Sequence, residues 1–307
     1  MKTKEDYTGL FAAVFTPMRE DGSLDLARVP AVVEYMLRVK IDGLYVCGST
    51  GEGPSLSSEE RRATAAAYVE ASAARLPVIV QVGHNSLAEA RELATHAQSI
   101  GAEAISALPP SYYGFKSVGT LTDCLAEIAA AAPNLPLFYY HIPSLSHVRL
   151  NVVELLGEAR NRLPGLAGIK YSDNIIDEFR ECIEFENRRY TILFGSDDLL
   201  LSALAVGATG AIGSTYNFAA PLYRRLINAF NAGNLDEAQK HQKLAVEMIQ
   251  LLSRYGAQPA FKATMKLLGV DCGPTRLPLE KLSSEQMQQL KEELDRIGFF
   301  EWALPEP

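Results

Sequence analysis

The sequence predicts an α/β fold of the (β/α)8 type, a TIM barrel, followed by a C-terminal helical extension. Eight short and nearly continuous apolar runs alternate with segments of helical pattern. Parallel strands that are covered by helices have this composition. Most of the runs begin roughly 30 residues apart, which is the length of one βα unit. An open doubly wound sheet is the competing prediction, but the even repeat and the lack of a GxGxxG string weigh against it.

The elements can be placed in order along the chain. The predicted strands are Gly9–Phe15, Gly43–Val46, Pro77–Val82, Ala104–Ala107, Pro136–Tyr140, Leu166–Lys170, Thr191–Phe194 and Thr209–Ile212. Between them, Ser57, Ser86 and Asn151 each precede a glutamate by three residues, which is the pattern of a helix N-cap. The segment Leu24–Val39 has apolar residues close to a 3.6-residue period and is also expected to be a helix.

The alternation stops after Asn231. Gly233 and Asn234 mark a joint, and no further strand pattern follows them. The remaining segments are typical of helices: Leu235–Arg254, Ala257–Leu268 and Ser284–Ile297. We therefore expect a catalytic barrel over residues 1–232 and a helical extension over residues 233–307 that packs on the barrel.

Composition excludes several function classes. The 307 residues carry a formal net charge of −8, so the chain has no overall attraction to nucleic acid or to an anionic membrane. A small anionic substrate stays compatible, because a site can hold local positive charge. The sequence has no apolar run long enough to span a membrane, and its first residues lack the apolar stretch of a signal peptide, so we expect neither feature. The four cysteines are far apart and suggest no zinc site or disulfide framework, so we expect a cytoplasmic protein.

Lys170 is the first candidate for chemistry. Active sites of this fold lie at the carboxyl ends of the strands, and Lys170 ends the sixth apolar run. A desolvated lysine has a lowered pKa and becomes a nucleophilic amine, whereas the alternative is an ammonium that reaches solvent or pairs with Asp173. The strand ends carry no cluster of metal ligands, and His84 and His141 are expected to be structural. We therefore expect neither a metal nor a cofactor.

A glycine-rich turn follows the second strand. The run Gly48–Gly53 places consecutive backbone amides, with the hydroxyls of Ser49 and Thr50, at the start of a helix. Such an arrangement binds a carboxylate, and the alternative is a tight turn in which the two hydroxyls cap the helix.

Tyrosines near the strand ends are candidates for proton transfer. Tyr140 ends the fifth strand and is expected to face the site, while Tyr139 points the opposite way and closes the barrel mouth as a buried aromatic residue. Tyr112 and Tyr113 follow the fourth strand on a loop, where an interface role and a catalytic role both remain open.

Taken together, these motifs resemble the dihydrodipicolinate synthase/N-acetylneuraminate lyase superfamily from about Gly9 to the C-terminal helices. The resemblance rests on four strand-end motifs in this order: Gly48-Ser49-Thr50-Gly51-Glu52, Tyr140-His141-Ile142-Pro143, Gly168-Ile169-Lys170 and Gly213-Ser214-Thr215-Tyr216-Asn217. It implies a homotetramer without cofactor that acts on a small 2-keto acid. Lys170 would form a Schiff base with that keto acid.

The resemblance also implies the roles of other residues. Tyr140 would relay a proton, assisted by Ser49 and by Tyr112 of a neighbouring subunit. Ser49, Thr50 and Gly51 would hold the substrate carboxylate. Further contacts to the rest of the substrate would come from Ser172, Gly195, Asp197, Asp198 and Ser214.

Within the superfamily the sequence is most similar to the animal-type lyase branch, whose substrate is a sialic acid. Synthases carry an arginine where this chain has Leu145, and Arg149 is expected to be a surface residue that flanks a helix. One departure is Asp198, where lyases of this type have glutamate. This departure keeps open a related aldolase, dehydratase or synthase-like enzyme for another 2-keto acid. A non-catalytic binding protein on the same barrel is the third hypothesis, and the intact Lys170 and Tyr140 argue against it.

Overall fold

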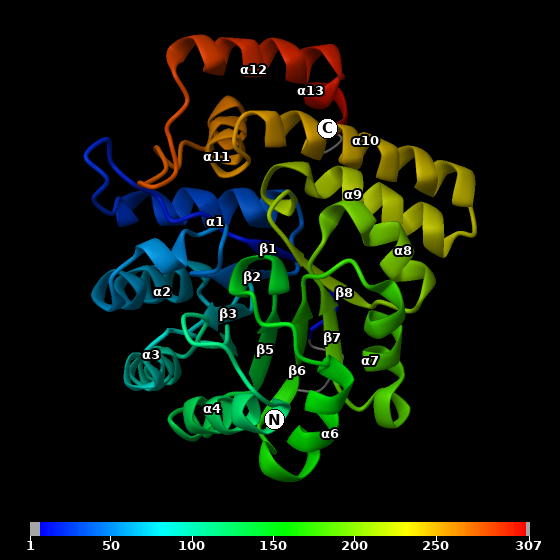
Figure 1. The fold of residues 1–307 in the computed structure, drawn as a ribbon. Coiled ribbons are helices and arrows are strands. Elements are labelled where there is room, and N and C mark those ends of the chain that lie inside the picture. The colour runs from blue at the N-terminus through cyan, green and yellow to red at the C-terminus, as the bar shows by residue number, and fades with distance from the viewer. Residues whose placement is uncertain (1–6, 305–307) are drawn as a thin grey trace.

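The computed structural model describes residues 7–304 and confirms the barrel (Figure 1). The first six residues, on which the expectation of no signal peptide partly rests, lie outside the described residues. Eight parallel strands close in chain order, β1 pairing with both β2 and β8. The strands are β1 (Gly9–Ala13), β2 (Gly43–Val46), β3 (Val78–Gln81), β4 (Ala104–Ala107), β5 (Leu137–His141), β6 (Leu166–Tyr171), β7 (Thr191–Phe194) and β8 (Gly210–Gly213).

Helices surround the strands on all sides (Figure 1). Their bounds are α1 (Val29–Arg38), α2 (Ser58–Ser72), α3 (Leu87–Ser99), α4 (Val118–Ala130), α5 (Pro143–Ser146), α6 (Val152–Arg162), α7 (Ile176–Arg188), α8 (Leu200–Ala205) and α9 (Tyr216–Asn231), with 3-10 turns η2 (Leu26–Arg28), η3 (Gly53–Ser55) and η4 (Asp197–Leu199). The predicted caps at Ser57, Ser86 and Asn151 each accept a hydrogen bond from the backbone amide three residues on. The first helix begins later than predicted, because Pro30 stands in its first turn and a 3-10 turn precedes it.

Successive side chains of each strand point to opposite faces of the sheet, so the core has one layer inside the barrel and one outside it. Phe11, Tyr45 and Tyr140 belong to a cluster inside the barrel. Tyr139 belongs instead to the larger cluster between the strands and the surrounding helices. The prediction that Tyr139 closes the barrel mouth is therefore wrong, although its burial and its opposite orientation are as expected.

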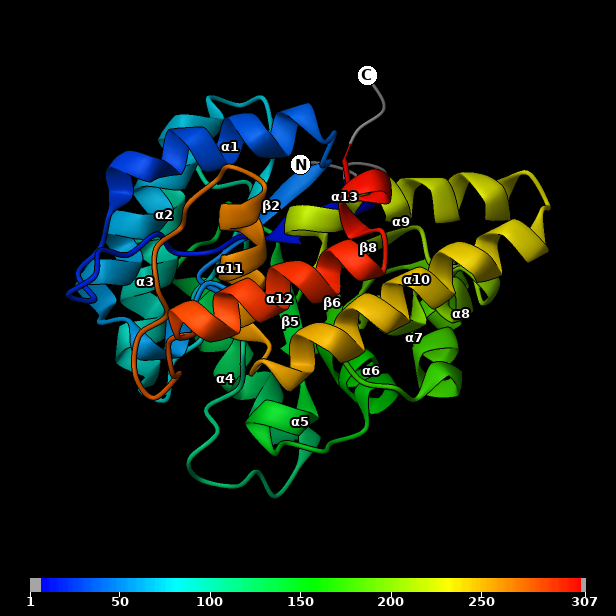
Figure 2. The ribbon, with the colours of Figure 1, turned by 90° about the horizontal axis from the view of Figure 1, so that it is seen from above.

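The C-terminal helices cross one side of the barrel (Figure 2). They are α10 (Leu235–Arg254), α11 (Gln258–Leu267), α12 (Ser284–Arg296) and α13 (Phe299–Trp302). The first three match the predicted helices to within one residue at each end, while the short α13 was not predicted. Helix α10 packs along α9, and α11 contacts both α9 and α12, so α9 is the main contact between the barrel and the extension. Within the described range 7–304, no helix is long and apolar enough to span a bilayer.

Candidate active site

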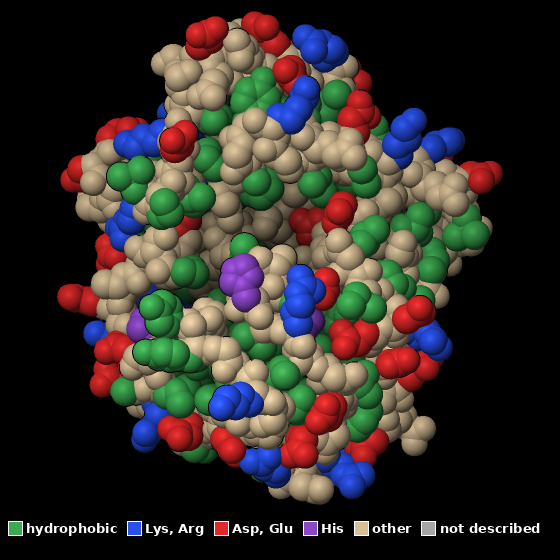
Figure 3. Space-filling view, viewed as in Figure 1, with side chains coloured by type: hydrophobic (Ala, Val, Ile, Leu, Met, Phe, Trp, Pro, Cys, Tyr) green, Lys and Arg blue, Asp and Glu red, His purple; other side chains and the backbone are tan. Residues whose placement is uncertain are grey.

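Lys170 lies inside the barrel near the carboxyl end of β6. Its neighbours Ile169 and Tyr171 face the surrounding helices, so alternation directs Lys170 to the interior. Only 4% of the residue is exposed. The alternative of a solvent-exposed ammonium therefore does not hold. The face seen in Figure 3 is hollowed over the centre of the barrel.

Two aromatic rings face the Lys170 amine. Nζ is 3.9 Å from the ring centroid of Tyr45 and 4.0 Å from that of Tyr140. Burial lowers the pKa of Lys170, and the interactions with Tyr140 and Asp197 oppose this shift without cancelling it. A larger fraction of the amine is therefore neutral than in free lysine, as a nucleophile requires.

Hydroxyl groups continue from this amine toward β2. Tyr140 is the register partner of Lys170 across β5 and β6, and its hydroxyl oxygen is 3.4 Å from Ser49 Oγ. Tyr45 packs edge-to-face on Tyr140 and donates a hydrogen bond to Ser106 Oγ at 3.0 Å. Sequence reasoning missed Tyr45 and Ser106. The two-residue period of β2, which turns Tyr45 inward, was the signal that could have identified Tyr45.

The turn after β2 is tightly built. Cys47 and Glu52 both have positive φ, 59° and 56°, which bends the chain at each end of the turn. Gly53 is needed because a Cβ there would lie 1.9 Å from the Cys47 carbonyl oxygen. Within residues 7–304, the backbone amides of 49–51 make no hydrogen bond to other backbone, so they remain available to an anion. Thr50 Oγ1 lies 2.6 Å from Ser214 Oγ and joins this turn to the end of β8.

The opposite side of the site is formed by the ends of β6 and β7. Ser172 and Gly195 are in close contact, since a Cβ on Gly195 would lie 1.9 Å from Ser172 Oγ. Asp197 is buried and accepts hydrogen bonds from Thr215 N at 2.9 Å and Thr215 Oγ1 at 2.6 Å. Burial raises the pKa of Asp197, and the bonds from Thr215 oppose this shift. The neighbouring Asp198 is half-exposed.

The loop tyrosines lie apart from these groups within the chain. Tyr112 is 81% exposed, and its ring packs edge-to-face on the equally exposed Tyr113 at 5.1 Å. The Tyr112 amide donates to Asn85 Oδ1 at 3.2 Å, which fixes the loop beside β3. The chain thus brings Lys170 and Tyr140 together and leaves Tyr112 on the surface.

The histidines at strand ends occupy structural positions. His84 Nδ1 accepts a hydrogen bond from the Ser86 amide at the start of α3. His141 is buried on the outer face of β5, where its ring lies 5.1 Å from that of Tyr171. No group of three His, Cys, Asp or Glu side chains in the described part of the chain could hold a metal ion. Leu145 and Arg149 are both exposed.

A buried lysine amine beside a tyrosine hydroxyl, at the carboxyl ends of barrel strands, is the geometry of a lysine-nucleophile lyase. The comparisons agree with this class. The sequence profile of the Dihydrodipicolinate synthetase family matches residues 6–297, and the chain belongs to this family.

The individual relatives are lyases of sialic acid by name. N-acetylneuraminate lyase A of Xenopus laevis is 41% identical over 88% of this chain and 90% of its own length. N-acetylneuraminate lyase of Rattus norvegicus is 37% identical over 96% of this chain and 94% of its own length. Among solved structures, the N-acetylneuraminate lyase (sialic acid aldolase) of Aliivibrio salmonicida has a TM-score of 0.94 at 37% identity, covering 97% of this chain and 98% of that one.

Proposed function

We propose that this chain is an N-acetylneuraminate lyase, a class I aldolase that cleaves N-acetylneuraminate to pyruvate and N-acetylmannosamine. The Lys170 amine carries the proposal, because it is buried between two tyrosine rings at the mouth of the barrel. Relatives named for this activity cover nearly the whole chain, which supports the substrate assignment.

The first step is imine formation. The neutral Lys170 amine adds to the C2 ketone of the open-chain substrate, and loss of water gives a protonated imine. The lowered pKa of Lys170 favours this addition at neutral pH. The cationic imine then accepts the electron pair of the C3–C4 bond, so the reaction needs no separate electron sink.

Proton transfer accompanies the cleavage. Tyr140 takes the proton of the C4 hydroxyl and passes its own toward Ser49, whose Oγ is 3.4 Å away. The C3–C4 bond breaks, N-acetylmannosamine leaves as the aldehyde, and the electrons remain in an enamine on Lys170. A proton returned along the same relay to C3, followed by hydrolysis of the imine, releases pyruvate and the free amine.

Substrate binding uses both sides of the site. The backbone amides of Ser49, Thr50 and Gly51 hold the carboxylate, which leaves the ketone over Lys170. The remainder of the sugar acid extends toward the ends of β6, β7 and β8. Its hydroxyl and acetamido groups are contacted by Ser172, Gly195, Asp197, Asp198 and Ser214.

We further propose a cytoplasmic homotetramer, with residues 1–232 as the catalytic barrel and 233–307 as its packed extension. Tyr112 belongs to the relay through a subunit interface, and its 81% exposure leaves the ring available for such a contact. All four cysteines are free, in agreement with a reducing compartment.

Release of pyruvate from a panel of 2-keto sugar acids tests the proposal. We expect cleavage of N-acetylneuraminate with the highest kcat/KM of the panel. Asp198, one methylene shorter than the glutamate of similar lyases, favours a second candidate, an aldolase or dehydratase for another 2-keto acid. Cleavage of a shorter keto acid without any cleavage of N-acetylneuraminate would select that candidate and refute the first.

A further inference from the structure

Helix α11 of the C-terminal extension reaches the carboxylate-binding turn. Gln258 and Lys262 are four residues apart, so their side chains lie on the same face of α11. Gln258 Nε2 donates to the Ser49 carbonyl oxygen at 3.0 Å, and Lys262 Nζ is 2.7 Å from Glu52 Oε1. One helix face therefore contacts both ends of the segment 49–52.

The Lys262 contact is a fixed structural anchor. The side chains of Lys262 and Glu52 are 3% and 1% exposed. Besides this ion pair, Lys262 Nζ donates to the carbonyl oxygens of Thr16 and Pro274, each at 2.9 Å. The other carboxylate oxygen of Glu52 accepts from the Arg276 amide at 2.8 Å. Because the ammonium is buried against Glu52 and these two carbonyl oxygens, it holds the turn and is not exposed to substrate.

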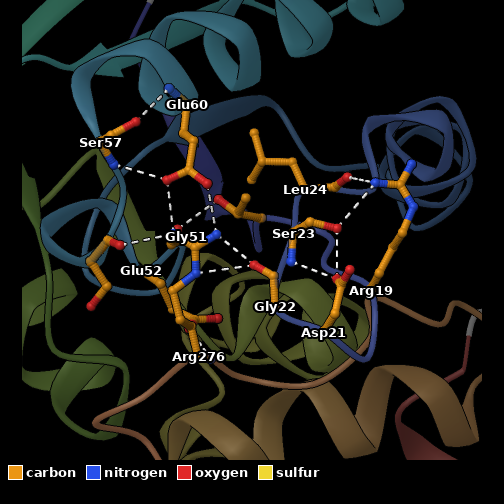
Figure 4. A network of polar contacts seen from close by, with 12 residues as sticks. Arg19, Asp21, Gly22, Ser23, Leu24, Gly51, Glu52, Ser57, Glu60 and Arg276 are labelled. Carbon is orange, nitrogen blue, oxygen red and sulfur yellow. Dashed lines mark hydrogen bonds and ion pairs between the residues drawn. The ribbon is translucent and has the colours of Figure 1, made fainter.

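Arg276 also holds the region around Glu52, through contacts with the start of α2 (Figure 4). Its guanidinium forms two hydrogen bonds of 2.8 Å with the two carboxylate oxygens of Glu60, which is also part of the capping box with Ser57. It donates further to the carbonyl oxygens of Gly22 and Ser55. The segment that follows α11 is thereby tied to the start of α2, and the position of α11 over the turn is fixed.

Gln258 differs from these anchors because it is half-buried and touches the residue that carries the relay hydroxyl. Ser49 Oγ is the group 3.4 Å from the Tyr140 hydroxyl. The residue before Gln258, Ala257, adopts φ 57° and ψ −86°, a backbone conformation that residues with a Cβ rarely adopt. Such strain persists only where the surroundings impose it, and here it sets the start of α11 at the turn.

We propose that Gln258 is a positioning residue of the active site. By holding the Ser49 carbonyl, it fixes the Ser49 hydroxyl relative to Tyr140 and aligns the amides of 49–51 for the substrate carboxylate. This inference rests on the proposed lyase function. Loss of one such hydrogen bond is expected to lower kcat/KM by roughly three- to tenfold.

The test compares Gln258→Met, which keeps the length but removes the donor, with Gln288→Met, an exposed glutamine on α12 that bonds Glu292. Steady-state kinetics, thermal unfolding and borohydride trapping of pyruvate on Lys170 are measured for each. We expect Gln258→Met to unfold at the wild-type temperature and to trap pyruvate only at higher concentration, with kcat/KM reduced as above. Gln288→Met should match the wild type in all three measurements.

A pH signature separates positioning from a packing effect. In Gln258→Glu the carboxylate repels the Ser49 carbonyl, whereas the protonated carboxyl donates to it. The activity of Gln258→Glu relative to wild type should therefore recover as pH falls, while that of Gln258→Met should not.

Wild-type kcat/KM in Gln258→Met, or no relative recovery of Gln258→Glu at low pH, would overturn the positioning role. If the wild type itself trapped no pyruvate, the proposed function would fail, and this inference with it.

Discussion

Replacing Lys262 by methionine tests how strongly the C-terminal extension holds the barrel. The change removes one partner of an ion pair whose side chains are 3% and 1% exposed, and leaves the Glu52 carboxylate without its counter-ion. Breaking such a buried pair costs about 3–5 kcal/mol of unfolding free energy. With an unfolding entropy of about 2.1 cal/mol/K per residue over 307 residues, the midpoint should fall by roughly 5–8 °C.

Thermal unfolding followed by circular dichroism measures this loss. The matched control is Lys266→Met one turn further along α11, where the lysine is 57% exposed and lies 3.4 Å from Asp271. Its expected effect is within about 0.5 kcal/mol. Adding Glu52→Gln to Lys262→Met should recover part of the loss, because no buried charge is then unpaired. Equal midpoints for Lys262→Met and Lys266→Met would refute the reasoning.

The remaining predictions concern the reaction. Burial lowers the pKa of Lys170 below its usual 10.5, so the amine becomes neutral at a lower pH than in free lysine. The rate of imine formation with pyruvate should therefore rise with pH and reach half its maximum below pH 10.5. A half-maximum at or above pH 10.5 would contradict the burial argument. Gly195→Ala should lower kcat/KM for N-acetylneuraminate roughly 10- to 100-fold, since its Cβ would lie 1.9 Å from Ser172 Oγ. Adding Ser172→Gly to Gly195→Ala should bring kcat/KM to that of Ser172→Gly alone, and a double variant that stays below Ser172→Gly would refute the clash. Mixed oligomers of Lys170→Ala and Tyr112→Phe subunits should be more active than either variant alone; no gain over the separate variants would place Tyr112 outside the relay.

Strand order and most helix bounds were predictable because they depend on local pattern. The apolar runs and the caps at Ser57, Ser86 and Asn151 are encoded within a few residues of each element. The pairing of Lys170 with Tyr140 was also within reach, since both lie near the carboxyl ends of neighbouring strands. The delayed start of the first helix shows the limit of such patterns, because apolar residues three apart fit both a 3-10 turn and the first turn of an α-helix.

Long-range polar contacts could not be predicted from the pattern. Gln258 and Lys262 lie more than 200 residues from the turn that they hold, as the separation of 209 between Gln258 and Ser49 shows. On a predicted helix, each is an ordinary polar residue until the packing of α11 is known. The same applies to Thr215, whose hydroxyl and amide both bond Asp197 across two strand ends.

Borohydride reduction in the presence of pyruvate, followed by peptide mass spectrometry, tests the central claim most directly. A buried amine of lowered pKa between Tyr45 and Tyr140 should carry one reduced pyruvate adduct on the peptide that contains Lys170. Lys170→Ala should carry none. An unmodified Lys170 in the wild type, or a stable adduct on a different lysine, would contradict the account.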